Sequence, residues 1–279
     1  MKPDAFRYDG KRAVVVGGAT GMGAATAQLV QDLGADVIVM DYAPVTFDVG
    51  ASVQLDLRDT QSIDAAVDAA GDRIDALFSC AGVADGTPGI ERVNFIGHRH
   101  FIDRALEKGL LGRGSAIGMI SSAAGLGWET DLELLQEYLD TPDFDTAVKW
   151  IEAHPDKADY MWSKETLCAY VAREAVNMLK RGIRINAILP GPTDTPLAQA
   201  NAEVWLGFGA DYREATGIEP SRPDEQAAVL AFLCCDAASY VNGQTVITDA
   251  GYVAAGVTGK WDSAKQVVDF FRGGHVATS

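Results

Sequence analysis

The stretch VVVGGATGMGAATA, residues 14–27, decides the expected fold, because it joins an apolar strand to a helix through closely spaced glycines. Gly17, Gly21 and Gly23 lack the Cβ atoms that would crowd such a turn. Backbone N–H groups at the helix N-terminus can then face a phosphate group directly. The stretch predicts a turn that holds a dinucleotide pyrophosphate, with Thr20 and Met22 among its contacts. By itself, the motif leaves open a tight turn without a ligand.

An acidic residue follows the second apolar run, in the sequence VMDY at residues 39–42. A carboxylate at this place can accept hydrogen bonds from both hydroxyls of an adenosine ribose, and it would repel a 2′-phosphate. Thr20, directly before Gly21, offers no positive charge to such a phosphate. Asp41 and Tyr42 are therefore expected to contact the adenosine, and NAD is favoured over NADP.

Apolar runs of strand length recur along the chain, with helical stretches such as residues 22–33 between them. Strands that are separated by helices run parallel, since a parallel neighbour needs a long crossover connection. The runs are nearly continuous in Val, Ile and Leu, as expected for strands covered on both faces. Residues 1–279 are therefore predicted to form one doubly wound, Rossmann-type α/β domain with a parallel seven-stranded sheet. The expected strands are residues 13–16, 37–40, 52–55, 76–79, 116–121, 184–189 and 245–247.

The interval after the fifth expected strand is too long for a simple connection, and it has helical patterns of its own. Thr130 or Asp131 can cap a first helix there, and Asp143 or Asp145 can cap a second. Residues 127–158 are therefore expected to form an acidic helical hairpin at the mouth of the site. The alternative is a surface addition that only blocks one oligomer interface, because the entropic cost of closing a loop grows slowly with its length.

The composition is that of a globular protein, with 48% hydrophobic and 22% charged residues. The net charge of −16 argues against nucleic acid and anionic membranes as partners, because like charges repel at long range. Cys80, Cys168, Cys234 and Cys235 lie in apolar runs and not at metal-ligand spacings, which favours reduced thiols in a core. The sequence shows no secretory leader and no membrane-spanning run, so the expected location is the cytoplasm.

The segment YMWSK, residues 160–164, places a phenol and an ammonium group on one helix face. A free phenol has a pKa of about 10, and a neighbouring cation lowers that pKa by favouring the phenolate. Tyr160 is therefore expected to act as a general acid or base, with its pKa lowered by Lys164 and by a positive nicotinamide. By itself, such a pair is more often an exposed helix pair, so its meaning depends on the other motifs.

Taken in sequence order, the motifs resemble those of the short-chain dehydrogenase/reductase family across residues 11 to about 252. The resemblance implies hydride transfer between a nicotinamide and a secondary alcohol or ketone. The matching motifs are Gly17-xxx-Gly21-x-Gly23, Asp41, Asp56-Leu57, Cys80-Ala81-Gly82, Asn94, Ser121-Ser122, Tyr160 with Lys164, and Pro190-Gly191-Pro192-Thr193-Asp194-Thr195.

The resemblance also implies a role for each matching residue. Tyr160 would exchange a proton with the substrate oxygen, and Ser122 would hydrogen-bond that oxygen, with Ser121 as the alternative serine. Lys164 would bind the nicotinamide ribose and lower the pKa of Tyr160. Asn94 would hold a water in the proton relay. The expected cofactor contacts are Gly17, Thr20, Gly21, Met22, Gly23, Asp41, Tyr42, Asp56 at the adenine, Leu57, Ala81, Gly82, Tyr160, Lys164, Pro190, Gly191, Thr193 and Thr195.

Some positions depart from the family pattern. Val16 stands where the family has Thr, and Ser79-Cys80-Ala81-Gly82 replaces its Asn-Asn-Ala-Gly. These changes remove side-chain hydrogen bonds between strands and leave the catalytic residues intact. The insertion, together with Ala-Ser-Tyr-Val at residues 238–241, resembles a subgroup similar to bacterial 3α-hydroxysteroid dehydrogenase/carbonyl reductases. That resemblance implies a hydrophobic substrate, with a hydroxysteroid or cyclic ketone as the first expectation.

Several questions stay open at the level of sequence. A catalytically silent module that binds NAD for sensing is one rival interpretation, and an epimerase or dehydratase of the extended family branch is another. A homodimer or homotetramer is expected, and the tail at residues 253–279 could pack on a neighbouring subunit. No metal is expected, because His98 and His100 lie two residues apart and point in different directions. Trp205, Leu206 and Phe208 either line an apolar pocket or pack the segment after Thr195.

Overall fold

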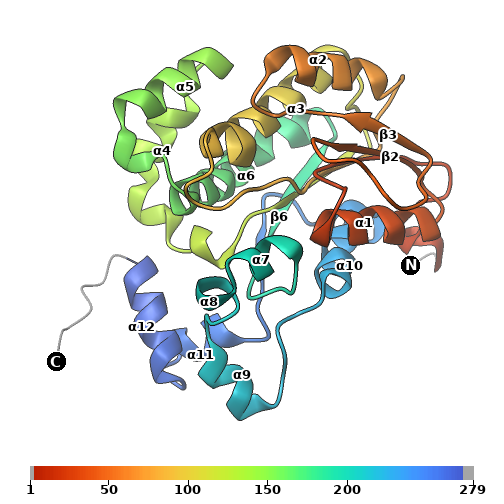
Figure 1. Ribbon diagram of the computed structural model, residues 1–279. Coiled ribbons are helices and arrows are strands. Elements are labelled where there is room, and N and C mark those ends of the chain that lie inside the picture. Colours follow the sequence, from red (N-terminus) through yellow and green to blue (C-terminus); the bar gives the residue numbers. More distant parts are fainter. Residues whose placement is uncertain (1–2, 273–279) are drawn as a thin grey trace.

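Seven parallel strands form one sheet in the computed structural model, which describes residues 3–272 (Figure 1). The strand order is β3-β2-β1-β4-β5-β6-β7. The chain therefore begins near the middle of the sheet, winds to the β3 edge and crosses back to β4. In such sheets the crevice outside the carboxyl ends of the strands, at this reversal, is the usual ligand site. The strands are β1 (Arg12–Val16), β2 (Asp36–Asp41), β3 (Ala51–Gln54), β4 (Ala76–Ser79), β5 (Ala116–Ile120), β6 (Arg184–Pro190) and β7 (Thr245–Thr248).

The predicted fold class is confirmed, and each expected strand overlaps an observed one. The differences lie at strand ends: β5 ends at Ile120, one residue before the expected end, and β6 extends to Pro190. In the register, Val16 of β1 lies beside Met40 of β2 and Ser79 of β4. The carboxyl ends of these strands therefore meet at one edge, where the glycine turn and Asp41 follow.

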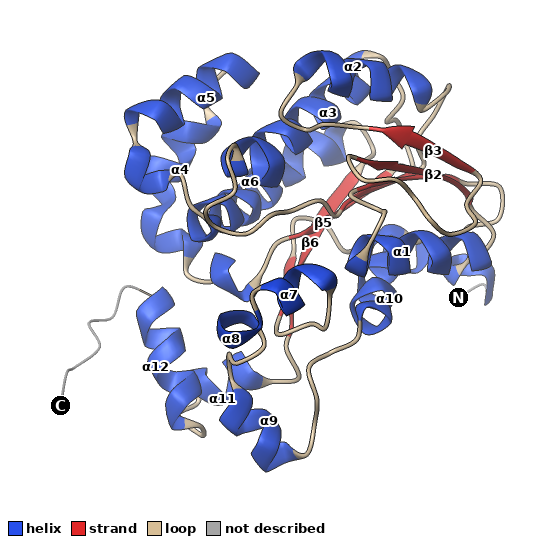
Figure 2. Ribbon diagram, viewed as in Figure 1, coloured by secondary structure: helices blue, strands red, loops and turns tan. Residues whose placement is uncertain are grey.

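Helices cover both faces of the sheet (Figure 2). One face carries α1 (Gly21–Asp32) and α10 (Pro223–Cys234), and the other carries α2 (Thr60–Ala69), α3 (Gly97–Glu107) and α6 (Tyr160–Lys180). Along β1, Ala13 and Val15 belong to the first core, whereas Val14 and Val16 belong to the second. This alternation explains the unbroken apolar run, since each fully buried Val stabilises the fold by about 1.5–3 kcal/mol. No helix within residues 3–272 is long and apolar enough to cross a membrane.

The insertion forms the two expected helices, α4 (Leu132–Leu139) and α5 (Phe144–Ala153). Asp143 caps α5 by accepting a hydrogen bond from the Thr146 N–H, while Asp131 precedes α4 without a side-chain cap bond. Both helices add apolar side chains to the core on the α3 and α6 side. Tyr138 of α4, for example, lies 5.8 Å from the ring of Phe95, between ring centroids.

The sequence predicts that residues 127–158 lie at the mouth of the site. None of these residues lines the catalytic cavity described below. The apolar faces of α4 and α5 instead pack on the outer side of α3 and α6. The hairpin is therefore part of the core packing on that side.

The segments after β6 surround the other side of the carboxyl edge. They form α7 (Pro196–Ala200), α8 (Ala202–Trp205) and α9 (Ala210–Thr216), and, after β7, α11 (Tyr252–Val257) and α12 (Asp262–Phe271). The helices α11 and α12 pack on one another within the same chain (Figure 1). Residues 273–279 of the predicted tail lie outside the described residues.

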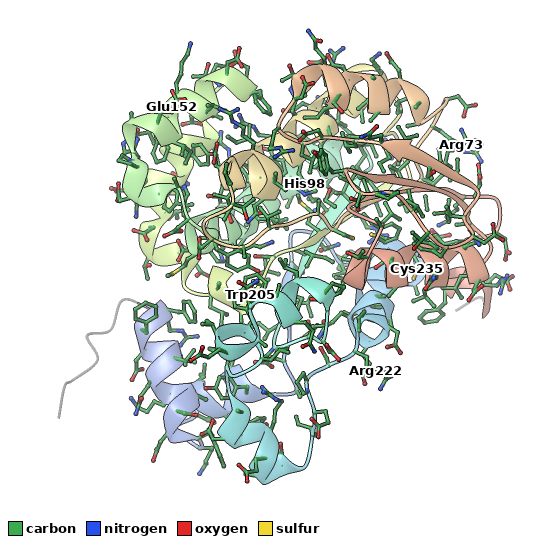
Figure 3. All side chains as sticks on the ribbon, viewed as in Figure 1. Arg73, His98, Glu152, Trp205, Arg222 and Cys235 are labelled. Carbon is green, nitrogen blue, oxygen red and sulfur yellow. The ribbon has the colours of Figure 1, made fainter. Side chains whose placement is uncertain are left out.

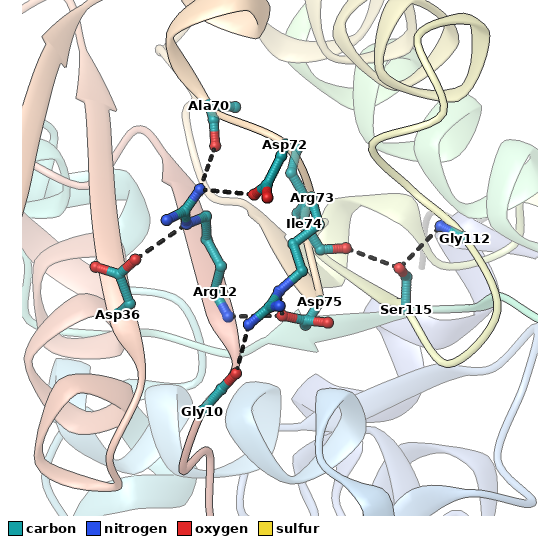
Figure 4. A network of polar contacts seen from close by, with 10 residues as sticks. All are labelled: Gly10, Arg12, Asp36, Ala70, Asp72, Arg73, Ile74, Asp75, Gly112 and Ser115. Atoms are coloured by element: carbon teal, nitrogen blue, oxygen red, sulfur yellow. Dashed lines mark hydrogen bonds and ion pairs between the residues drawn. The ribbon is translucent and has the colours of Figure 1, made fainter.

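A polar network joins the starts of the strands at the opposite edge of the sheet (Figure 4). The Arg12 guanidinium pairs with Asp36 at 3.0 Å and with Asp72 at 3.2 Å, and the Arg12 N–H donates to Asp75. Arg73 also donates to Asp75, at 3.0 Å. The network connects β1, β2 and the start of β4, and it leaves the carboxyl edge free for the site.

Candidate active site

The glycine turn after β1 is as tight as the sequence requires. A Cβ on Gly17 would lie 2.2 Å from the Ala81 backbone nitrogen, and one on Gly23 would lie 2.0 Å from the Gly17 carbonyl oxygen. Thr20 occupies the N-cap of α1 and makes no side-chain cap bond. The first N–H groups of α1 therefore remain available at the positive end of the helix dipole. This arrangement fits a pyrophosphate group.

A groove of about 390 Å³ runs from this turn across the ends of β2 and β3. Arg58 is the only basic residue along its lining. The expected cofactor contacts that line the groove are Gly17, Thr20, Gly21, Met22, Gly23, Asp41, Tyr42, Asp56, Leu57, Ala81, Gly82 and Thr195.

The Asp41 carboxylate is held in a fixed orientation at the end of β2. One oxygen accepts the Ala19 N–H and the other accepts the Ala43 N–H, each at 2.8 Å. Each carboxylate oxygen can accept a further hydrogen bond. Asp41 therefore presents two oriented acceptors to the groove.

Arg58, which the sequence analysis missed, connects two expected adenosine contacts. Its guanidinium lies 5.1 Å from the centre of the Tyr42 ring and forms two parallel hydrogen bonds with Asp56, each of 2.8 Å. This pairing lowers the pKa of Asp56, because the guanidinium favours the carboxylate. The positive charge of Arg58 is thus already matched by a carboxylate. A cation two residues after Asp56 was the available signal.

A second cavity, of about 260 Å³, adjoins the groove and contains Ser122, Tyr160 and Lys164. We call it the catalytic cavity. The two cavities share lining residues, among them Met22 and Gly82. Other expected cofactor contacts that line the catalytic cavity are Pro190, Gly191, Thr193 and Thr195, so every residue expected to contact the cofactor lines one of the two cavities.

Tyr160 is the first residue of α6, and two carboxylates fix the start of that helix. Asp159 caps it by accepting the Trp162 N–H at 2.7 Å. Asp85, which the sequence analysis missed, accepts the Tyr160 N–H at 2.6 Å. The loop after β4 thereby holds the backbone of Tyr160, so the phenol projects from a rigid support into the cavity.

The electrostatics at Tyr160 differ from the expectation. Burial raises the pKa of Tyr160 to about 12, a hydrogen bond with Ser122 works against this rise, and the negative charge of Asp85 adds to it. The Lys164 ammonium lies 5.3 Å from the centre of the phenol ring, and its nitrogen donates to the Ile120 carbonyl at 3.1 Å. Burial also lowers the pKa of Lys164 to about 8. The protein alone therefore raises the pKa of Tyr160, because the loss of solvation outweighs the hydrogen bond.

The two serines at the end of β5 have different surroundings. The Ser121 hydroxyl is buried and donates to the Lys164 carbonyl at 2.9 Å, which fixes α6 against β5. Ser122 lies beside the phenol, and its hydroxyl also accepts the Ala124 N–H. Of the two, only Ser122 has its hydroxyl directed to Tyr160.

Asn94 is completely buried in a short π-helical turn (Arg92–Ile96) and lines neither cavity. Its side chain accepts the Val83 N–H at 2.8 Å and donates to the Val83 carbonyl and to Ser163, both at 3.1 Å. Asn94 therefore fastens the loop after β4 to the start of α6. Its Oδ1 atom and the Lys164 ammonium both lie next to Gly82.

Aromatic side chains cover the open side of the phenol. Trp205, at the end of α8 (Figure 3), lies with its ring 4.9 Å from the ring of Tyr160, and Phe208 also lines the cavity. These contacts favour the pocket-lining interpretation of Trp205 and Phe208. Phe271, on α12, lines the same cavity and was not predicted. Only its apolar character in the tail could have pointed to it.

Comparisons with known proteins agree with this arrangement. A family model described as enoyl-(acyl carrier protein) reductase matches residues 146–253. Coniferyl-alcohol dehydrogenase of Pseudomonas sp. (strain HR199 / DSM 7063) is 31% identical over 250 residues, which cover 86% of this chain and 96% of that protein. Cis-4-hydroxycyclohexanecarboxylate dehydrogenase of Sinomonas cyclohexanicum is 30% identical over 261 residues, with 87% and 96% covered.

A solved structure is similar as well. The 3-alpha-hydroxysteroid dehydrogenase from Pseudomonas sp. B-0831, complexed with NADH, superposes with a TM-score of 0.72 at 28% identity, covering 88% of this chain and 97% of that one. The similarity thus extends over nearly the whole length of these dehydrogenases. These relatives, the strand order and the order of the motifs along the chain agree with one another. They show that the chain belongs to the short-chain dehydrogenase/reductase family and is an oxidoreductase that acts on alcohols or ketones.

Proposed function

We propose that the protein interconverts a hydrophobic secondary alcohol and its ketone with NAD as the cofactor, and that Tyr160 is its general acid and base. The observation that carries the proposal is the convergence of Tyr160, Ser122 and Lys164 in one cavity that adjoins the dinucleotide-sized groove. A nicotinamide dinucleotide bound in the groove supplies the acceptor or donor of the hydride. The residues of the chain then have to orient the substrate and move its proton.

In alcohol oxidation, Tyr160 in its phenolate form accepts the proton of the substrate hydroxyl. Ser122 orients the same substrate oxygen and stabilises the phenolate through its hydrogen bond. Lys164 is held beside the phenol by the Ile120 carbonyl and is placed to bind a ribose hydroxyl. Because the protein alone raises the pKa of Tyr160, a positive charge on the cofactor is the influence that favours the phenolate during oxidation.

Asn94 acts as a positioning residue in this proposal. Its amide N–H groups are used by Val83 and Ser163, whereas Oδ1 can accept one more hydrogen bond. That lone pair, next to Gly82 and Lys164, is the group available to a water of the proton relay.

Preference for NAD over NADP is part of the proposal. Asp41 presents a carboxylate where a 2′-phosphate would lie, and the like charges would repel. The charge of Arg58 is already matched by Asp56 through two hydrogen bonds, which reduces its attraction for a 2′-phosphate. The similar dehydrogenase structure that contains NADH supports the same choice.

The lining of the catalytic cavity favours a hydrophobic substrate, a hydroxysteroid or a cyclic ketone. Val204, Trp205, Phe208 and Phe271 face the reactive groups. Pockets for drug-sized ligands measure roughly 300–1,000 Å³, and this cavity of about 260 Å³ is smaller. Between the two substrates, the size favours a single-ring alcohol or ketone, and the relative that acts on a hydroxycyclohexane acid supports this.

A homo-oligomeric assembly and a cytoplasmic location belong to the same proposal. The sheet ends at the edge strand β7, and the side chains of Phe232 and Tyr240 are exposed, which supports contact with a second copy. Three of the four cysteines are buried and all four are free, which supports a reducing compartment.

The test is the absorbance of NADH during incubation with a panel of cyclic alcohols and hydroxysteroids. We expect NAD-dependent oxidation of at least one single-ring alcohol, and the reverse reaction with the matching ketone. Tight binding of NAD without turnover of any compound would instead favour the catalytically silent NAD-binding module.

A further inference from the structure

A third cavity, of about 880 Å³, lies behind the catalytic cavity. Residues of α9, α11 and α12 and the end of β7 surround it. Four residues line both cavities, namely Gly191, Pro192, Phe208 and Phe271. The two phenyl groups are the large side chains among them, and with the backbone at Gly191 and Pro192 they form the partition that separates the small cavity that holds Tyr160 from the larger one.

The larger cavity is suited to an apolar group. Its walls include Tyr252, Val253, Val257 and Val268, which come from the two C-terminal helices. Charged residues line it as well: Glu219, Glu225 and Arg272 are exposed, and the Asp249 carboxylate accepts the N–H groups of Gly251 and Val253. The guanidinium of Arg213, also in the lining, is used by the carbonyls of Phe208 and Leu206. An alkyl or aryl group of a substrate would therefore be removed from water there and would gain apolar contacts.

The backbone near Phe271 is held closely against the start of the insertion. A Cβ on Gly127 would lie 1.6 Å from the Phe271 carbonyl oxygen, and Gly127 has a φ of +78° that favours glycine. Within the C-terminal pair of helices, Ala264 and Val268 of α12 are buried, and a Cβ on Gly256 of α11 would meet the Ala264 carbonyl at 2.4 Å. The end of α12 is thus fixed on both sides, and the Phe271 ring is a wall of the site.

The two partition residues differ in how firmly they are held. Phe208 packs edge-on against Tyr252, with ring centroids 5.2 Å apart, and Arg213 binds its carbonyl. Phe271 has Phe270 as its aromatic neighbour among the described residues, and Phe270 is exposed. Removal of the Phe271 side chain would therefore open the partition while leaving the Phe208 wall in place.

We infer that Phe271 is a specificity-determining residue that limits the size of the substrate, and that its removal joins the catalytic cavity to the apolar cavity behind it. The inference rests on the proposed function, because it concerns the substrate of that site. The wild-type protein accepts a compact cyclic alcohol, whereas a ring that carries an apolar chain meets the Phe271 ring. Without that ring, the chain enters the larger cavity.

The experiment compares Phe271→Ala with its matched control Phe270→Ala, which removes the same atoms from an exposed neighbour that lines neither cavity. Values of kcat/KM are measured for cyclohexanol and for 4-pentylcyclohexanol with NAD. We expect Phe271→Ala to raise the ratio of 4-pentylcyclohexanol to cyclohexanol by at least about tenfold, since each well-placed methylene is worth about that factor or more. Phe270→Ala should leave the ratio at its wild-type value.

An unchanged ratio in Phe271→Ala, an equal rise in Phe270→Ala, or a wild-type enzyme that already prefers the longer alcohol would each overturn the inference. NADH affinity and the thermal midpoint show whether each variant is folded, and Phe271→Leu decides the question if the alanine variant is not. Calorimetric binding of cyclohexanone and 4-pentylcyclohexanone gives the same ratio without turnover. Absence of turnover in the wild type therefore counts against the proposed function, and the binding ratio still decides the inference.

Discussion

The indole of Trp205 lies against the phenol of Tyr160, with ring centroids 4.9 Å apart and ring planes inclined by 42°. The two residues come from α8 and from the first turn of α6, and the contact closes one side of the catalytic cavity. Since burial is the largest influence on the pKa of Tyr160, the indole takes part in setting that pKa.

We predict that Trp205→Ala lowers the pKa of Tyr160 from about 12 by roughly one unit, because water then reaches the phenol and solvates the phenolate. The pH profile of kcat/KM for alcohol oxidation should move to lower pH by the same amount. Trp261→Ala is the control, since Trp261 hydrogen-bonds Asp211 and lines neither the groove nor the catalytic cavity. A profile that stays in place, or moves to higher pH, contradicts the prediction.

Tyr160→Phe removes the hydroxyl and keeps the ring. We predict that turnover falls by at least about a thousandfold, because the group proposed to exchange the proton with the substrate oxygen is lost. NADH affinity, measured by fluorescence titration, should change little, since the ring still packs on Trp205. Tyr240→Phe makes the same change at a fully exposed position and should keep wild-type activity. Retained turnover in Tyr160→Phe would remove Tyr160 from its proposed role.

Asp41→Ala removes the carboxylate that faces the expected position of the 2′-phosphate. We predict that the ratio of kcat/KM with NAD to kcat/KM with NADP falls by at least about tenfold, because repulsion between close like charges is worth several kcal/mol. Asp48→Ala, an exposed change of equal charge outside the groove lining, is the control. If both variants keep the wild-type ratio, another group discriminates between the cofactors.

His98→Gln tests a buried base below the loop after β4. The His98 ring contacts the Ala81 carbonyl at 3.0 Å, and burial lowers the pKa of His98 from 6.5 to about 4. Between these two values the unfolded chain binds a proton that the folded chain does not, so the stability contributed by neutral His98 is lost as the pH falls. At pH 4 this loss amounts to about 3 kcal/mol.

The measurement is the free energy of unfolding by urea at several pH values between 7 and 4. Carboxylates titrate alike in both proteins, so the difference between the wild type and His98→Gln isolates His98. We expect the wild type to lose more stability with falling pH than the variant. Two parallel curves would show that His98 is already protonated in the folded protein or accessible to water.

Local patterns were sufficient to predict the sheet. In β1, for example, both sets of alternating residues are buried in cores on opposite faces, so the strand appears in the sequence as an unbroken apolar run. Of the two caps predicted for the second helix of the insertion, Asp143 and Asp145, the structure has Asp143, and the start of α5 was predictable because a cap involves only neighbouring residues. The groups expected at the groove and at Tyr160 also converge, since parallel strands end at one edge. Their roles in catalysis and cofactor binding stay predictions.

What the sequence could not indicate depends on contacts between distant segments. The leucines of α4 would be buried against an apolar surface both at the mouth of the site and on the outer side of α3 and α6. Only the tertiary structure shows that they pack on the outer side of α3 and α6. Asp85 binds the Tyr160 N–H from a loop, and Phe271 lines the same cavity from the last described helix, and no local pattern indicates either. The rise in the pKa of Tyr160 in the protein alone could not be predicted either, because Lys164 is visible in the sequence, whereas the desolvation of the phenol is not.

The polar network around Arg12 has a consequence for engineering this protein. It fastens the amino ends of the strands, whereas the proposed substrate site lies at their carboxyl ends, a full strand length away. Substitutions so far apart, without shared neighbours, generally combine additively. Thermostability could therefore be improved by substitutions around Arg12 in one library while substrate range is altered around Phe271 in another. The best substitutions of the two libraries could then be combined in one protein without a new round of screening.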